Sequence, residues 1–283
     1  MDSKALSSAD ARSRAPIGIF DSGVGGLTVL KAIARQLPHE ALLYFGDTAR
    51  LPYGTRSQVE IIQFVREILN WMQLHGAKMV VMACNTSSAL ALDCVRREFD
   101  MPILGVILPA ARMAARGKRI GVIATPATAA SRSYTQAMLE YNPAVQVWEV
   151  GCPEFVPIIE SGRIYEPSTT SIVATHVQKL IEHDIDTLVY GCTHYPHLKP
   201  VIDTLLPGSI HQVDPAVPVS EAVFHELQML GLLNMETAQH RTIRYCVSQH
   251  PEKFSSLASQ WLGYIPQVEQ ITLMPLIGYQ VQV

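Results

Sequence analysis

A buried strand that ends in a cysteine occurs twice in this chain, and this repeat constrains the fold more than any other feature. Residues 79–83 form an uninterrupted apolar run, and Cys84 follows directly. Such a run predicts a strand of a parallel sheet that is covered on both faces. The second occurrence lies 108 positions later, where the run 186–190 leads through Gly191 to Cys192. Short polar residues follow both cysteines, so the same local structure is predicted at each place.

A second pair of matching stretches lies upstream of the two cysteines. Residues 17–23 and 120–126 each begin with isoleucine and glycine inside an apolar run, and they stand 103 positions apart. Two related pairs at nearly the same spacing indicate a duplicated α/β unit. Ligands bind at the carboxyl ends of strands in open α/β sheets. The predicted fold is therefore α/β, with two pseudo-symmetric parallel-sheet domains, an active site in the cleft between them, and one cysteine on each wall.

The order of the predicted elements divides the chain into two domains. The first contains residues 16–108 and 218–283 and is therefore discontinuous, whereas the second contains residues 109–217. Residues 1–15 are small and polar and are predicted to form a flexible N-terminal arm. Apolar periodicity predicts several helices and a late strand: helices over Ser57–His75, Ser87–Phe99, Pro167–His183, Pro218–Leu230 and Pro251–Leu262, and a strand over Ile243–Val247.

Composition and charge argue against several classes of protein. With 283 residues, of which 48% are hydrophobic, the chain can bury a sizeable core. Its formal net charge of −3 gives no electrostatic basis for binding nucleic acid or a membrane surface. A run of about 18 apolar residues is missing, as is the apolar core of a signal peptide, so no membrane span is expected. The five cysteines form no C-x-x-C pair, so we expect reduced thiols and a cytoplasmic protein.

Two thiols on opposite walls of a cleft restrict the chemistry. A metal site needs three or four ligands, but no histidine accompanies Cys84 as His194 accompanies Cys192. A cysteine hydrolase leaves Cys84 without a role, and a redox pair requires sulfurs close enough to bond. Proton transfer remains: one thiolate removes a proton from carbon, and the other thiol returns a proton on the opposite face. Helix amides beside each cysteine are expected to lower its pKa toward the working pH.

Other polar residues near the predicted strand ends have both a structural and a functional interpretation. The glycine-rich stretch 21–26 is a tight turn between strand and helix, and its amides can bind an anion. Asp21 at its start can steer the protonation of a nearby thiol. Taken alone, the remaining candidates have structural interpretations. Tyr53–Gly54 forms a turn, Thr125 and Thr128 are helix caps, and Glu160 is a solvated acid.

Six stretches between Ile17 and Leu262 resemble motifs of the glutamate racemases: IGIFDSGVGGLTV, YFGDTARLPYGTR, ACNTSSA, CPEFVPIIESG, GCTHYPHL and PEKFSSLA. The resemblance implies interconversion of L- and D-glutamate without cofactor or metal, which supplies D-glutamate for bacterial peptidoglycan. The bases of that family are the cysteines of its ACNT and GCTH motifs, and they fall on Cys84 and Cys192. By this resemblance Cys84 abstracts the α-proton of D-glutamate and Cys192 that of L-glutamate.

The resemblance also assigns assisting residues, each by its position in a matching motif. The aspartate of DSG falls on Asp21, beside the first thiol, and the aspartate of the GD pair falls on Asp47. The glutamate that closes the CPEFVP stretch falls on Glu160, and the GCTH histidine on His194, both near the second thiol. Substrate contacts are expected at Asp21, Ser22, Tyr53, Gly54, Asn85, Thr86, Thr125, Thr128, Thr193 and His194.

Partners and rival functions follow from the same comparison. The expected partner is glutamate, with no direct binding to nucleic acid or membrane, while a homodimer and a peptidoglycan-precursor activator stay open. Ala124 and Ala110 stand where glycine is common in the family, but neither removes a catalytic atom. The rival enzyme is a two-thiol racemase acting on aspartate. The rival binding function is association with DNA gyrase, which some members of the family show as a side activity.

Overall fold

Two separate parallel sheets organise the molecule, which is described by a computed structural model over residues 11–236 and 242–274. The larger sheet contains β1 (Ile17–Asp21), β2 (Leu42–Gly46), β3 (Met79–Met82), β4 (Ile103–Gly105), β9 (Ile243–Val247) and β10 (Val268–Gln270). The smaller sheet contains β5 (Arg119–Ala124), β6 (Gln146–Gly151), β7 (Thr187–Gly191) and β8 (His211–Val213). All pairings between these strands are parallel. The predicted α/β fold with two parallel-sheet domains is therefore confirmed.

The strand order repeats between the two sheets. The larger sheet runs β10-β9-β2-β1-β3-β4, and the smaller sheet runs β6-β5-β7-β8. In each, the first strand of the unit lies between the second and the third. This shared order is what a duplicated α/β unit requires, and it places a topological switch point beside β1 and β3 in one sheet and beside β5 and β7 in the other. Ligands of doubly wound sheets bind at such points, outside the carboxyl ends of the strands.

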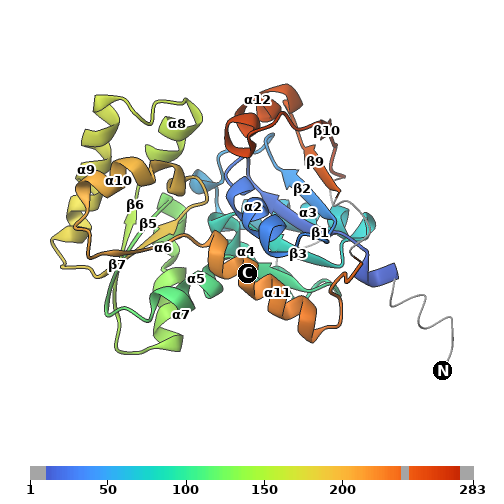
Figure 1. Ribbon diagram of the computed structural model, residues 1–283, viewed down its shortest axis with the longest axis horizontal. Helices are drawn as coiled ribbons and strands as arrows, with labels where there is room; N and C mark the ends of the chain where they lie inside the picture. The colour runs from blue at the N-terminus through green and yellow to red at the C-terminus, as the bar shows by residue number, and fades with distance from the viewer. Residues whose placement is uncertain (1–10, 237–241, 275–283) are drawn as a thin grey trace.

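Helices cover both sheets, and the two halves lie side by side in Figure 1. The helices that flank the larger sheet are α2 (Leu27–Gln36), α3 (Gln58–Leu74), α4 (Asn85–Val95) and α12 (Pro251–Leu262). Those of the smaller sheet are α6 (Pro126–Ser131), α7 (Ser133–Tyr141), α8 (Phe155–Glu160), α9 (Pro167–Ile181) and α10 (Lys199–Leu205). Helices α5 (Ile107–Ala114) and α11 (Ala216–Met229) contact each other between the halves, and α11 also packs on α2.

Local sequence explains where most helices begin and end. Ser57, predicted as the first residue of a helix, is instead the N-cap of α3, where its hydroxyl accepts from the Glu60 amide while the Glu60 carboxylate accepts from the Ser57 amide. The helix predicted from Ser87 begins at Asn85, directly after Cys84. Helix α12 and strand β9 have the predicted bounds. The other predicted helices are correct to within two residues at each end, apart from the early end of α4 at Val95.

The predicted division into domains at 108/109 and 217/218 stays a prediction. The strands of the smaller sheet all lie within 119–213, but one core cluster contains apolar residues from both halves, among them Val81 and Val122. Residues 1–10 of the predicted arm lie outside the described residues, and residues 11–13 form a helical turn. Within residues 11–236 and 242–274, no helix is long and apolar enough to cross a bilayer.

Candidate active site

Both cysteines of the repeat lie at carboxyl ends of central strands. Cys84 follows β3 and is the N-cap of α4, and Cys192 follows β7 just before the short 3-10 helix η2 (Tyr195–Leu198). They are 5% and 6% exposed. Each therefore sits at the switch point of its own sheet, as the apolar runs before them predict.

Residues from the two sheets meet directly around these cysteines. A Cβ atom placed on Gly25 would lie 2.3 Å from His194 Nδ1 and 2.5 Å from Thr193 Oγ1, so only glycine allows this approach. The Thr28 hydroxyl, in the first turn of α2, donates to the Thr193 carbonyl at 3.4 Å. The turn after β1 and the segment after β7 therefore form touching walls of one site.

A second set of contacts joins the walls near Cys84. The Thr86 hydroxyl lies 2.9 Å from that of Thr125 and 3.3 Å from that of Thr128. The Tyr134 hydroxyl of α7 donates to Asn85 Oδ1 at 2.7 Å. Gly54 packs on Thr125, because a Cβ there would come within 3.1 Å of the threonine Cβ. These contacts bring together five residues that the sequence placed at the substrate: Gly54, Asn85, Thr86, Thr125 and Thr128.

The environment of Cys84 disfavours its thiolate in the free protein. Burial raises the pKa of Cys84 to about 12, the charge of Asp21 adds to this, the Ser87 amide opposes it, and the charge of Cys192 raises it further. The expected lowering by helix amides is thus outweighed, because burial and a neighbouring carboxylate both penalise the negative sulfur.

Asp21 is held in place at the end of β1. Its Oδ2 accepts from the amides of Gly23 at 3.1 Å and Gly26 at 3.0 Å, and the residue is 1% exposed. Ser22, the next residue, is also buried. The glycine-rich turn thus uses two of its amides on its own carboxylate, which fixes that negative charge beside Cys84.

Cys192 has a different partner. His194 Nδ1 lies 3.8 Å from Cys192 Sγ, and His194 Nε2 lies 3.1 Å from Glu160 Oε1. Burial would lower the pKa of His194, but hydrogen bonds with Cys192 and Glu160 and the charges of Cys192 and Asp21 raise it to about 10. The structure thus brings together Cys192, His194 and Glu160 in a line that can move or hold a proton.

Trp261 of α12 encloses this histidine from the other half of the molecule. Its ring meets His194 edge-on, with centroids 5.8 Å apart, and stacks on His197 at 4.1 Å. Burial, the His194 charge and Lys31 lower the pKa of His197 to about 4. One histidine of the segment thus favours its charged form and its neighbour the neutral form.

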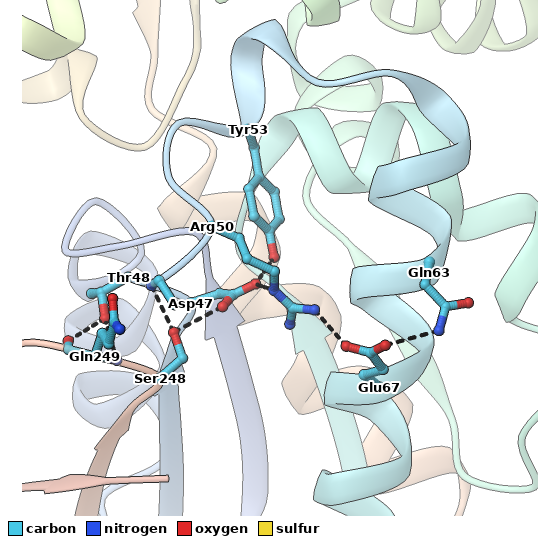
Figure 2. Close-up of polar contacts among 9 residues, drawn as sticks. Asp47, Thr48, Arg50, Tyr53, Gln63, Glu67, Ser248 and Gln249 are labelled. Atoms are coloured by element: carbon cyan, nitrogen blue, oxygen red, sulfur yellow. Dashed lines mark hydrogen bonds and ion pairs between the residues drawn. The ribbon is translucent and has the colours of Figure 1, made fainter. Parts of the chain in front are cut away.

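Asp47 belongs to a polar network (Figure 2). Among the described residues, its side chain forms no hydrogen bond with a cysteine. Its Oδ2 accepts from Arg50 Nε at 2.6 Å and from the Tyr53 hydroxyl at 2.5 Å, and its Oδ1 accepts from the Ser248 hydroxyl at 2.9 Å. The Asp47 amide donates to the Asp21 carbonyl at 2.9 Å, which keeps the network next to the end of β1.

The site offers hydrogen-bond groups suited to carboxylates. Asn85 Nδ2 is buried and has no hydrogen-bond partner among the described residues, although Asn85 Oδ1 is bonded to Tyr134. A buried amide donor of this kind is costly unless a ligand uses it. Thr86 and Thr193, which follow Cys84 and Cys192 in the sequence, are also buried.

A small cavity lies beside Glu160. A cavity of about 50 Å³ is lined by Gly23, Glu160 and Lys253 among others, and neither cysteine lines it. It has room for a few water molecules only. Among the described residues, no group of three or more His, Cys, Asp or Glu side chains is arranged to hold a metal ion.

Sequence reasoning missed several residues that shape this site. Tyr134 orients Asn85, Ser248 binds Asp47, and Trp261 covers His194. Each lies far along the chain from its partner, so no local pattern could have revealed it. Arg50 stands within a matching motif, but its spacing alone does not show that it pairs with Asp47.

Comparisons with known proteins identify the family of this chain. The Asp/Glu/Hydantoin racemase family matches residues 17–223. A glutamate racemase from a Nostoc species is 61% identical over 265 residues, covering 93% of this chain and 90% of the relative.

Solved structures give the same result. A glutamate racemase isoform from Bacillus anthracis has a TM-score of 0.89 at 35% identity, covering 92% of this chain and 98% of its own. The Francisella tularensis glutamate racemase, solved in complex with D-glutamate, has a TM-score of 0.86 at 34% identity, with coverage of 92% and 98%. On its sequence and its two-sheet fold, this chain is an isomerase that belongs to the Asp/Glu/Hydantoin racemase family.

Proposed function

We propose that this protein interconverts L- and D-glutamate by proton transfer between the α-carbon and two cysteines, Cys84 and Cys192. The observation that carries the proposal is the pair of nearly buried cysteines at equivalent strand ends of two repeated units, whose walls touch each other. The substrate is taken from the relatives, because curated relatives at 61% and 60% identity are glutamate racemases. The site adds an unpartnered amide donor and clustered hydroxyls, which suit a dicarboxylate.

The proposed reaction balances as two proton transfers. With D-glutamate bound, the Cys84 thiolate takes the α-proton, and the electron pair left on carbon is delocalised into the α-carboxylate. The Cys192 thiol then gives its proton to the opposite face of the carbon, which produces L-glutamate. The two sulfurs have exchanged protonation states at the end, so a proton must pass through solvent or the assisting side chains before the next turnover. The reverse reaction uses the same groups in the opposite order.

Assisting roles differ on the two sides. On the Cys192 side, His194 passes or holds the proton and Glu160 keeps its ring oriented. On the Cys84 side, Asp21 is the nearby charge, and it pairs with the substrate ammonium. Ser22, Asn85, Thr86 and Thr193 bind the two carboxylates, together with Tyr53, Gly54, Thr125 and Thr128 near the Cys84 wall.

The wider parts of the proposal rest on the family. We propose that the reaction supplies D-glutamate for peptidoglycan synthesis in the cytoplasm and uses no cofactor. The described cysteines are free thiols, which suits a reducing compartment. The two-domain division at 108/109 and 217/218 belongs to the same proposal. A homodimer and a peptidoglycan-precursor activator stay open predictions.

Purified protein in deuterium oxide tests the proposal. Incubation with each pure enantiomer, after treatment with a chelator and a carbonyl reagent, is expected to place deuterium at the α-carbon of both L- and D-glutamate. Aspartate serves as the competing substrate and is expected to react much more slowly. Faster reaction with aspartate would move the substrate assignment to the rival racemase. Loss of activity with either reagent would contradict the cofactor-free mechanism.

A further inference from the structure

A chain of charged and polar groups behind the Cys84 wall has no part in the proton transfers proposed above. It starts at Glu67 on α3, passes through the Arg50 guanidinium to Asp47 after β2, and ends at the Tyr53 hydroxyl (Figure 2). The Asp47 side chain is fully buried, and those of Glu67 and Arg50 are 11% and 20% exposed. Charges this far from solvent require close partners.

Arg50 connects two carboxylates on different elements. Its Nε donates to Asp47 Oδ2 at 2.6 Å, and its Nη1 donates to Glu67 Oε2 at 2.5 Å. The guanidinium also lies 4.3 Å from the centre of the Phe64 ring, one turn before Glu67. Gln63 donates to the other Glu67 oxygen at 2.8 Å, which fixes the orientation of that carboxylate. The planar fork of arginine is suited to such a bridge, whereas lysine is a point charge.

Tyr53 is the end of this chain that reaches the active site. Its side chain is 2% exposed and belongs to the same buried cluster as Cys84. The 3-10 helix η1 (Tyr53–Thr55) that it anchors carries Gly54, which packs on Thr125 of the other wall. Ser248, at the end of β9, holds the remaining Asp47 oxygen from the opposite side. The position of η1 against Cys84 thus depends on where Asp47 and Arg50 hold the Tyr53 hydroxyl.

We propose that Arg50, braced by Glu67, is a positioning residue that acts through Asp47 and Tyr53 to set the Cys84 wall of the site. This inference rests on the proposed racemisation and assigns Asp47 the role of an anchor for η1 rather than of a proton carrier. A displacement of about 1 Å in a reacting group can cost up to about 100-fold in rate. A loosened anchor is therefore expected to act mainly on the step at Cys84.

Arg50→Lys and Tyr53→Phe test this role, with Arg56→Lys as the matched control. Arg56 ends the same loop but pairs with Glu60 at 3.4 Å at the surface. We expect kcat per folded molecule to fall about 10- to 100-fold in Arg50→Lys and Tyr53→Phe, and to stay within about twofold of wild type in the control. Because both changes break one chain of contacts, the double variant should be hardly slower than the worse single variant.

Isotope effects separate positioning from general destabilisation. The primary effect with α-deuterated D-glutamate should rise in both variants. That with α-deuterated L-glutamate should fall, because slower proton transfer at Cys84 makes the Cys192 step less rate-limiting. An enzyme that is merely less stable would lose active molecules with neither isotope effect altered. If Arg50→Lys fails to fold, Glu67→Gln, which keeps the shape and removes the charge, takes its place beside Tyr53→Phe.

The outcomes distinguish this inference from the proposed function. Wild-type protein that does not racemise glutamate contradicts the proposed function itself. An active wild type whose Arg50→Lys variant matches the Arg56→Lys control overturns the positioning role alone. Equal rises in both isotope effects, or rate losses that multiply in the double variant, also overturn it.

Discussion

The two cysteines occupy equivalent places in two repeated units, yet their surroundings differ. Cys192 has His194 within 3.8 Å, and Glu160 stands behind that histidine at 3.1 Å. Among the described residues, no histidine forms a hydrogen bond with Cys84. Burial and the charge of Asp21 raise the pKa of Cys84 to about 12. The backbone around the two cysteines is thus similar in the two units, whereas the side chains that can exchange protons with them differ.

A two-base site therefore does not need two equal bases. L- and D-glutamate have the same free energy, so kcat/KM must be equal in the two directions whatever the bases are. Asymmetry between Cys84 and Cys192 can appear only in kcat, in KM and in isotope effects taken separately. Variants on the Cys84 side and on the Cys192 side should therefore differ in kcat, KM and isotope effects.

The largest effect is expected on removing either base. Cys84→Ser and Cys192→Ser should each lower the racemisation rate by about 10²- to 10⁴-fold, since serine is a much weaker proton acceptor. The primary isotope effect should rise with α-deuterated D-glutamate for Cys84→Ser and with α-deuterated L-glutamate for Cys192→Ser. Cys94→Ser, which changes an exposed thiol, is the control. A variant of either base that keeps a tenth of the wild-type rate would contradict the two-base mechanism.

The next effect sharpens the difference between the sides. His194→Asn should lower kcat by about 100-fold, because Cys192 loses the group that holds its proton. Its isotope effect should rise with α-deuterated L-glutamate and fall with the D enantiomer, because the Cys84 step becomes less rate-limiting. His176→Asn is the matched control, because His176 forms a similar pair with Glu154 at 2.9 Å outside the contacts of Cys192. An equal change for both enantiomers would place His194 in a role shared by the two sides.

A smaller loss tests the contact between the walls. Gly25→Ala adds a methyl group that would come within 2.3 Å of His194 Nδ1, so the imidazole must move. We expect kcat to fall about 10-fold or more, with the isotope pattern of His194→Asn. Gly208→Ala is the control, because a Cβ there meets no atom within 4 Å. Normal activity in Gly25→Ala would show that the walls part enough in solution to accept the methyl group.

The smallest effect concerns stability and contrasts two neighbouring histidines. The folded-state pKa of His197 is lowered to about 4 from 6.5, so the folded protein binds fewer protons than the unfolded chain between these values. Its contribution to stability is full above about pH 6.5 and is lost as pH falls toward 4. His194, whose pKa is raised to about 10, contributes most below about pH 6.5, and that contribution is lost as pH rises through about 10.

Urea unfolding near pH 7.5 and near pH 5 measures the His197 contribution. Lowering the pH from 7.5 to 5 should decrease the free energy of unfolding of His197→Gln by about 1–2 kcal/mol less than that of wild type. His225→Gln changes an exposed histidine and should follow wild type. If the free energy of unfolding decreases equally in wild type and His197→Gln on acidification, His197 is not held neutral by its packing on Trp261.

Much of the architecture was predictable because it depends on short segments. The apolar runs before Cys84 and Cys192 are strands in the structure, and the predicted bounds of β9 and α12 are correct. Other boundaries depended on details that periodicity does not give. Ser57 caps α3 instead of opening it, and α4 starts at Asn85, because Cys84 is its N-cap.

The site was predictable as a set of motifs but not as a set of contacts. The motifs placed Asp47 among the catalytic residues, whereas the structure shows its oxygens bound by Arg50, Tyr53 and Ser248. The Ser87 amide lowers the pKa of Cys84, as expected of a helix amide, but burial and Asp21 outweigh it and the net pKa is raised to about 12. Burial depends on the whole fold and cannot be computed from a strand and the helix that follows it.

Two thiols at the ends of two similar strands follow from the amino-acid sequence alone, since hydrophobic runs and the residues after them are local properties of the chain. The surroundings of each thiol depend on how the whole chain packs. Ser248 reaches Asp47 across 201 positions, and Gly25 meets His194 across the boundary between the sheets. Contacts of this kind arise when separate elements pack together, and the proton chemistry of each cysteine depends on them.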